Sequence, residues 1–218
     1  MKAMILAAGR GERMRPLTDV LPKPLLEVHG KALIVWHIEK LVQSGFSEII
    51  INLAHLGHKI PEALGNGSKW GITITYSDES EFGALESAGG ILNALTLLGE
   101  EPFLVVNGDV FCDYEFNSNF ELKDKLAHLI LVPNPEHNLK GDFALEDSCV
   151  YNEGRQKYTF SGIAYYNPKI FMGLRKGKSA LAPLLREKIA QNLLNGELYT
   201  GVWHDIGTPQ RLDEINNI

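Results

Sequence analysis

The chain has 218 residues, of which 44% are hydrophobic and 22% are charged, so it is long enough for one α/β domain and short for two. A formal net charge of -6 argues against a nucleic-acid partner, because binding a polyanion requires a broad basic surface. We also expect no membrane association and a cytoplasmic location, since the chain begins without a signal peptide, lacks any apolar run near about 18 residues and has only 2 cysteines.

Hydrophobic periodicity predicts alternating strands and helices in the first half of the chain. Residues 3–6 form a short apolar run followed by glycines, as expected for a buried strand. Residues 32–42 have helical spacing, and Gly45 follows as a stop signal. The β-branched run 48–53 is too short for a helix, so these segments give a parallel βαβ unit. The same reasoning predicts a short helix near Pro61, strands at 72–76 and 103–106, and a helix at 86–98.

The second half of the chain has a less regular pattern. Its apolar segments predict strands at 126–132, 142–144, 148–151, 159–166 and 198–204, and helices at 181–194 and after Pro209. The whole pattern predicts an α/β fold of Rossmann-like type, with a mostly parallel mixed sheet flanked by helices. We expect a single domain over residues 1–218, in which the second half walls the site.

The stretch after the first strand carries the strongest functional signal. Gly9 and Gly11 can take positive φ and lack a Cβ, so successive backbone N–H groups can form a concave surface that suits phosphate oxygens. Four cations follow within fourteen residues, against the negative net charge of the chain, at Arg10, Arg13, Arg15 and Lys23. The sequence therefore predicts an anion site at the edge of the sheet.

Two familiar phosphate-binding motifs do not fit this stretch. A P-loop would require Gly-Lys-Ser/Thr, and a dinucleotide fingerprint would require glycine at the position of Met14. Instead, Gly-x-Gly-x-Arg at 9–13, Pro-Leu-Thr at 16–18 and Pro-Lys-Pro at 22–24 resemble the signature of the sugar-nucleotide pyrophosphorylases. These nucleotidyltransferases join a nucleoside triphosphate to a sugar 1-phosphate, and the resemblance implies their GT-A-like nucleotide-diphospho-sugar transferase fold.

The resemblance also implies roles for individual residues. Residues 1–110 would bind the nucleotide and residues 111–218 the sugar. Arg13 and Lys23 would be catalytic, holding the phosphates as a guanidinium fork and a compact ammonium group. The nucleotide-binding residues implied are Ala8, Gly9, Gly11, Glu12, Arg13, Lys23, Glu86 and Gly89. Those implied for the sugar phosphate are Asn107, Asp142, Glu153 and Ser161.

Two carboxylates are candidates for a metal site. Asp109 and Asp205 each end a predicted strand and could converge on Mg2+, which favours a few carboxylates together with phosphate oxygens. This pairing resembles the metal site of the family. Asp205 could instead cap the closing helix, a role that also suits Thr208, and Asp109 could be a turn residue.

The substrates follow from the same resemblance. Segments 51–55, 106–109 and 141–143 are most similar to the short members that use UTP and N-acetylmuramate 1-phosphate in bacterial cell-wall recycling. The Glu-Glu-Lys segment of hexose-1-phosphate enzymes is absent, and Asn152-Glu153-Gly154 lies near its place. We therefore expect UTP and a sugar 1-phosphate as partners, in a monomer or small homo-oligomer. The alternatives are a mannose 1-phosphate guanylyltransferase and a non-catalytic nucleotide-sugar sensor.

Overall fold

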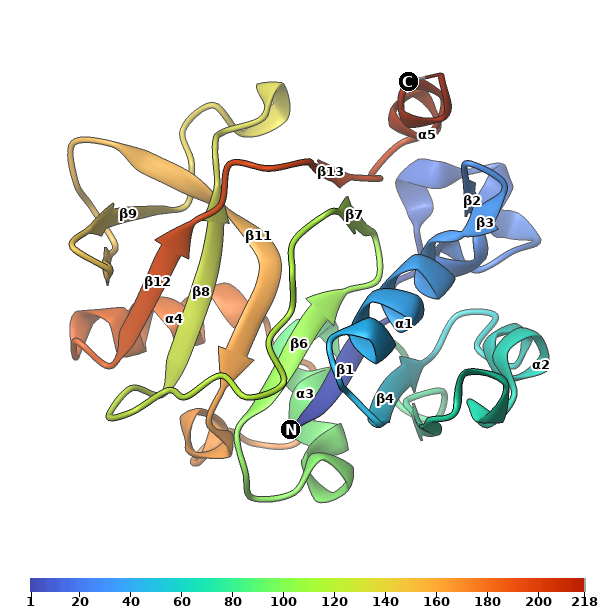
Figure 1. Cartoon of the computed structure of the whole chain (residues 1–218), viewed down its shortest axis with the longest axis horizontal. Helices are drawn as coiled ribbons and strands as arrows, with labels where there is room; N and C mark the ends of the chain where they lie inside the picture. The colour runs from blue at the N-terminus through green and yellow to red at the C-terminus, as the bar shows by residue number, and fades with distance from the viewer. Residues whose placement is uncertain (218) are drawn as a thin grey trace.

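The computed structural model describes residues 1–217, and its centre is one nine-stranded sheet (Figure 1). Strands β5, β4, β1 and β6 pair in parallel, whereas β11 runs antiparallel to both β6 and β8. The sheet therefore continues from the first half of the chain into the second. In spatial order its strands are β5 (Thr73–Asp78), β4 (Glu48–Leu53), β1 (Lys2–Leu6), β6 (Phe103–Asn107), β11 (Lys157–Tyr166), β8 (Ala127–Val132), β12 (Leu194–Leu198), β10 (Cys149–Tyr151) and β9 (Phe143–Glu146).

Helices cover both faces of this sheet. In Figure 1, α1 (Leu33–Gln43) lies in front of the sheet, while α3 (Glu86–Leu98) and α4 (Leu181–Ala190) lie behind it. The apolar stripe of α1 packs into the same core cluster as that of α2 (Lys59–Leu64), and α3 and α4 share the cluster on the other face. Burial of these stripes holds the helices on the sheet, because apolar surface is removed from water on both sides.

Short elements complete the chain and extend the loops around the sheet. Two small sheets have two strands each. One pairs β2 (Glu27–Val28) with β3 (Lys31–Ala32), and the other pairs β7 (Val110–Cys112) with β13 (Trp203–Asp205). Helix α5 (Pro209–Asn216) packs against β2 near the end of the chain. The 3-10 segments are η1 (Glu12–Met14), η2 (Leu17–Asp19), η3 (Lys23–Leu25), η4 (Ser68–Trp70), η5 (Glu136–Asn138) and η6 (Pro168–Phe171).

The structure confirms the predicted α/β fold with a mixed sheet flanked by helices, but the sheet is not mostly parallel, because β11, β10 and β9 pair antiparallel. It also corrects the expected elements near the end of the chain. Helix α4 ends at Ala190, because Asn192 takes a left-handed φ of 56° that a helix cannot continue through. Leu194 then begins β12, which pairs in parallel with β8. The single strand expected at 198–204 is wrong: β12 ends at Leu198, and β13 begins only at Trp203.

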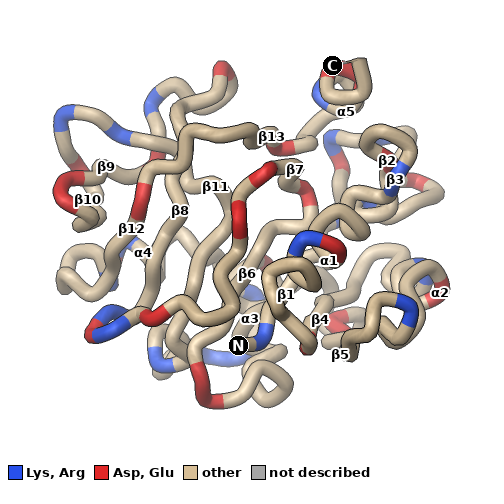
Figure 2. The backbone as a smooth tube through the Cα atoms, viewed as in Figure 1, with Lys and Arg blue, Asp and Glu red and all other residues tan. Residues whose placement is uncertain are grey.

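Charged residues are spread along the whole chain. Lys and Arg are interspersed with Asp and Glu over the molecule (Figure 2). Among residues 1–217, no helix is both long and apolar enough to span a lipid bilayer.

Candidate active site

The glycine-rich loop leaves the carboxyl end of β1 and turns sharply at Gly11. Gly11 adopts the left-handed conformation with φ 62° and forms the N-cap of η1. A Cβ there would lie 2.9 Å from the side chain of Thr18, whose hydroxyl donates to the Gly11 carbonyl at 2.8 Å. Both φ and the close contact therefore require glycine. Met14 is 0% exposed and packs into the cluster beneath η1, which explains why an apolar residue stands there instead of a third glycine.

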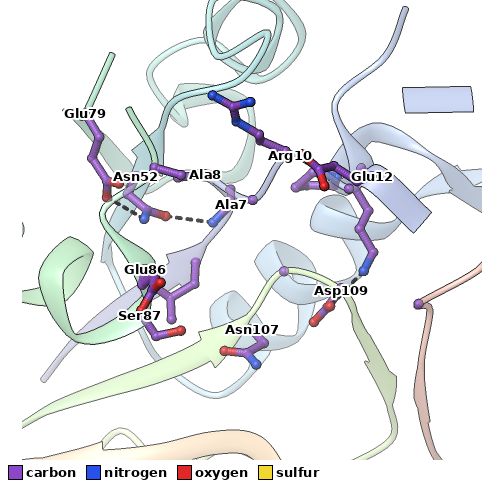
Figure 3. Close-up of a pocket in the computed structure, with 18 of the residues that line it drawn as sticks. Ala7, Ala8, Arg10, Glu12, Asn52, Glu79, Glu86, Ser87, Asn107 and Asp109 are labelled. Atoms are coloured by element: carbon purple, nitrogen blue, oxygen red, sulfur yellow. Dashed lines mark hydrogen bonds and ion pairs between the residues drawn. The ribbon is translucent and has the colours of Figure 1, made fainter. Parts of the chain in front are cut away.

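The loop forms one wall of a cavity of about 500 Å³ at the carboxyl ends of β1, β4, β5 and β6. This is the edge at which open α/β sheets bind their ligands. The start of α3 and the segment after β6 form the facing wall (Figure 3). Of the residues predicted from the sequence, those that line this cavity are Ala8, Gly9, Gly11, Glu12, Arg13, Lys23, Glu86, Asn107 and Asp109, joined by Arg10.

Lys23 and Asp109 form an ion pair at the edge of the cavity. The Lys23 Nζ donates to Asp109 Oδ2 at 2.8 Å, and the Lys23 side chain is only 11% exposed. Pro22 and Pro24 are buried on either side of the lysine, which fixes its backbone in the first turn of η3. Gly108 donates its N–H to the carbonyl of Leu6, so the chain after β6 stays close to β1 and places Asp109 at the cavity. Lys23 is therefore not a solvated surface charge.

A buried polar network joins three strands below the glycine-rich loop. Asn52 Oδ1 accepts the Ala7 N–H at 2.7 Å, and Asn52 Nδ2 donates to Glu79 Oε1 at 2.7 Å (Figure 3). Glu79 Oε2 accepts the Leu85 N–H at 3.0 Å, just before α3. Glu79 is 0% exposed, and its burial raises the pKa of its carboxyl group. The network therefore links the first amide of the glycine-rich loop to the start of α3.

Sequence reasoning did not assign this network. Glu79 was not among the predicted site residues, although its side chain is buried. A signal was present in β4, where Asn52 interrupts a run of isoleucines near the end of a buried strand. A polar side chain in such a position needs hydrogen-bond partners, which here come from the neighbouring strand and loop.

Asp205 lies near Asp109 in the backbone but has other side-chain partners. Its carboxylate pairs with Arg211 Nη1 at 2.5 Å and with His137 Nε2 at 3.1 Å. The backbone brings the two acidic segments together, because β13 pairs with β7. Thr208 is the N-cap of α5, so the alternative role of Asp205 as the cap is wrong. The side chain of Asp205 instead holds the first turn of α5 through Arg211.

Asp109 offers a divalent cation one carboxylate, through the oxygen that Lys23 does not bind. Mg2+ is usually held by one or two carboxylates together with substrate phosphate oxygens, and Asp109 presents a carboxylate to the cavity beside the phosphate-type loop. Among residues 1–217, no group of three or more His, Cys, Asp or Glu side chains forms a metal cluster. Asp205 would have to exchange Arg211 and His137 for the metal in order to act as a second ligand.

A second cavity of about 480 Å³ adjoins the first, sharing Glu86, Ser87 and Asn107 as lining residues. Asp142 lies here, and its Oδ2 accepts the Phe160 N–H at 2.8 Å. Asn107 therefore lies between the two cavities.

Besides Asp205, three residues predicted from the sequence lie outside both linings. Gly89 is buried in α3, where a Cβ would collide with the carbonyl of Gly177. The Glu153 side chain is 84% exposed and pairs with Lys157 at 3.3 Å. Ser161 is 1% exposed and donates its hydroxyl to the Ile130 carbonyl at 2.7 Å. These three were predicted as ligand contacts, but the structure gives them packing, surface and backbone-supporting positions.

Ser161 nevertheless belongs to a feature that shapes the site. The pairing of β11 with β8 shifts register between Phe160 and Ile163, and Gly162 takes a φ of 79° within this bulge. A Cβ at Gly162 would lie 2.5 Å from Asn107 Nδ2. The bulge therefore leaves the room that the Asn107 side chain occupies.

The fold and the site define a nucleotide-binding transferase of the α/β class, and comparison with known proteins agrees. The family model "Nucleotidyl transferase" matches residues 2–143, so the chain belongs to the nucleotidyl transferase family. The chain is 55% identical to N-acetylmuramate alpha-1-phosphate uridylyltransferase of Neisseria meningitidis serogroup B, over 98% of this chain and 96% of that protein.

More distant relatives share the fold with other activities. The chain is 31% identical to mannose-1-phosphate guanyltransferase of Hypocrea jecorina over 96% of its own length, but it spans only 62% of that protein. A crystal structure from Bacillus anthracis, assigned as a glucose-1-phosphate thymidylyltransferase and solved with a sucrose, superposes with a TM-score of 0.87 at 23% identity, over 100% of this chain and 94% of that one. This likeness shows the fold alone.

Proposed function

We propose that this nucleotidyltransferase transfers UMP from UTP to N-acetylmuramate α-1-phosphate. A phosphate oxygen of the sugar attacks the α-phosphorus of UTP, the bond to the β-phosphate breaks, and the products are UDP-N-acetylmuramate and pyrophosphate. The observation that carries the proposal is the 55% identity to the Neisseria meningitidis enzyme over 98% of this chain and 96% of that protein. The reaction would take place in the cytoplasm, within peptidoglycan recycling.

The residues around the first cavity suit the nucleotide part of this reaction. A triphosphate carries about four negative charges, so catalysis of phosphoryl transfer depends mainly on positioning and charge compensation. Arg13 would bind phosphate oxygens as a fork, and Lys23 would contact the reacting phosphates. Backbone N–H groups of Gly11 and Glu12 would complete the phosphate site.

Mg2+ would be held by Asp109 and substrate phosphate oxygens, with Asp205 as a possible second ligand in place of its present partners. When bound, the ion would neutralise charge on the phosphates. Asn107 and Asp142, which line the second cavity, would contact the sugar 1-phosphate. The first half of the chain would thus bind the nucleotide and the second half the sugar.

A substrate panel tests the proposal. Pyrophosphate release is followed with UTP, GTP, ATP, CTP and dTTP against the 1-phosphates of N-acetylmuramate, N-acetylglucosamine, glucose and mannose. UTP with N-acetylmuramate 1-phosphate should give the highest kcat/KM. A preference for GTP with mannose 1-phosphate would overturn the substrate assignment, and release with no pair would favour a nucleotide-sugar sensor. The variant Asp109→Asn provides the background rate from contaminating enzymes.

A further inference from the structure

The second cavity contains one cationic side chain among the described residues that line it, Arg186 of α4. Its guanidinium lies over the ring of Phe143, 5.1 Å from the centroid. Arg186 Nη2 also donates to the backbone carbonyl of Asp142 at 3.4 Å. The side chain is half-buried, so stacking and this hydrogen bond hold the guanidinium at the cavity wall.

This guanidinium has no carboxylate partner within residues 1–217. By contrast, Lys188 on the same helix does have a carboxylate partner, Glu187, at 2.7 Å. The two acidic residues of the cavity have their own partners: the Asp142 carboxylate accepts from Phe160 N–H, and Glu86 pairs with Lys178 at 3.3 Å. Most of the five N–H donors of Arg186 therefore remain available to a ligand in the cavity.

We propose that Arg186 binds a carboxylate carried by the sugar 1-phosphate, which in N-acetylmuramate is that of the 3-lactyl ether. This inference rests on the proposed function and names the group that selects the sugar. A planar guanidinium and a carboxylate form two parallel hydrogen bonds, so the pair fixes both charge and orientation. N-acetylglucosamine lacks this group and would leave the guanidinium unpaired.

The rest of the cavity fits the same sugar. Leu181, Leu185, Phe143 and Phe160 give it apolar walls, which suit the methyl groups of the lactyl and N-acetyl substituents. The two cavities meet at Asn107, so a sugar bound in the second one can direct its phosphate toward the first. The carboxylate at Arg186 then binds at a wall separate from the phosphate-binding loop.

The test compares N-acetylmuramate 1-phosphate with N-acetylglucosamine 1-phosphate in wild type, Arg186→Met and Arg186→Lys, with UTP fixed at saturation. Arg186→Met should lower kcat/KM for the muramate substrate about 10- to 100-fold, mainly through KM, as expected for losing a hydrogen bond to a charged group. The rate with N-acetylglucosamine 1-phosphate should stay within about threefold, because that sugar has no group at this position. Arg186→Lys should be intermediate, since it keeps the charge and loses the fork. Lys188→Met on the same helix is the matched control and should leave kcat/KM unchanged for both substrates.

A second measurement keeps the inference testable if the variants fold poorly. Wild-type enzyme is assayed with the lactyl carboxamide analogue of the muramate substrate, which should show a similar 10- to 100-fold loss, about that of a charged hydrogen bond. Equal losses with both sugars in Arg186→Met, or equal rates with carboxylate and carboxamide in wild type, would overturn the role of Arg186 while leaving the proposed function intact. Failure of wild type to use N-acetylmuramate 1-phosphate at all would overturn the proposed function itself.

Discussion

Asn52 offers a direct test of the buried network below the glycine-rich loop. Replacing it with leucine, which has a similar volume, removes the acceptor of the Ala7 N–H and a donor to Glu79. Both remaining groups are buried, and leaving a buried polar group unsatisfied costs about 1–3 kcal/mol each. The free energy of unfolding should therefore fall by about 2–6 kcal/mol, the sum of these two effects.

Equilibrium unfolding in urea measures this loss, with the m-value monitored to confirm that the same surface is exposed. The matched control is Asn93→Ala, which removes a half-buried hydrogen bond to Ser77 Oγ and should cost only about 1 kcal/mol. A cost for Asn52→Leu no larger than that for Asn93→Ala would refute the reasoning.

Three further predictions concern the site and its surroundings. Asp109→Asn should lower kcat by about 100- to 1,000-fold, the range for losing a preorganised electrostatic group, with a circular dichroism melt close to that of wild type. Lys23→Ala should lower both kcat and substrate affinity in steady-state assays, whereas Arg10→Ala should have much less effect; equal small effects would indicate a diffuse cationic field. Burial lowers the pKa of His37 from 6.5 to about 4, so the folded protein holds the neutral ring. The stability from this shift is present above pH 6.5 and is lost as the pH falls toward 4, by up to about 3 kcal/mol. In His37→Gln, the free energy of unfolding measured in urea with EDTA should therefore depend less on pH between pH 4 and 7.5. Parallel pH profiles for wild type and variant would contradict the lowered pKa of His37.

The first half of the chain was predictable because its signals are local. The β-branched run Glu48–Leu53 forms β4 with the expected bounds, and the helix expected at 86–98 is α3. The glycine-rich loop was also predictable, since its glycines, cations and prolines are contiguous in the sequence. In contrast, β12 at Leu194–Leu198 depends on pairing with β8, which lies more than sixty residues earlier. The apolar residue that begins β12 continues the helical pattern of α4, so the local sequence could not show where the helix ends and the strand begins.

The difference between local and long-range signals also explains which residues of the candidate site were predicted. The loop residues predicted to bind the nucleotide line the cavity, because a short loop at a strand end leaves few alternatives for their position, whereas Arg15 lies outside the lining and pairs with Asp19. Glu79 and Arg186 were missed because their surroundings come from other elements: Asn52 and Leu85 surround one, and Phe143 stacks on the other. No local pattern marks such residues as different from ordinary charged residues in a loop or on a helix.

The ion pair at the cavity edge also accounts for the residue type at position 23. A lysine ammonium group has three N–H donors, and Lys23 donates one of them to Asp109 at 2.8 Å. Under the proposed function, the remaining two would donate to phosphate oxygens, so that one side chain would hold the carboxylate and a phosphate at the same time. The planar fork of an arginine would match a single carboxylate or phosphate with both of its parallel donors. Arg13 lines the cavity without a carboxylate partner within residues 1–217, so under the proposed function both parallel donors of its fork would bind phosphate oxygens.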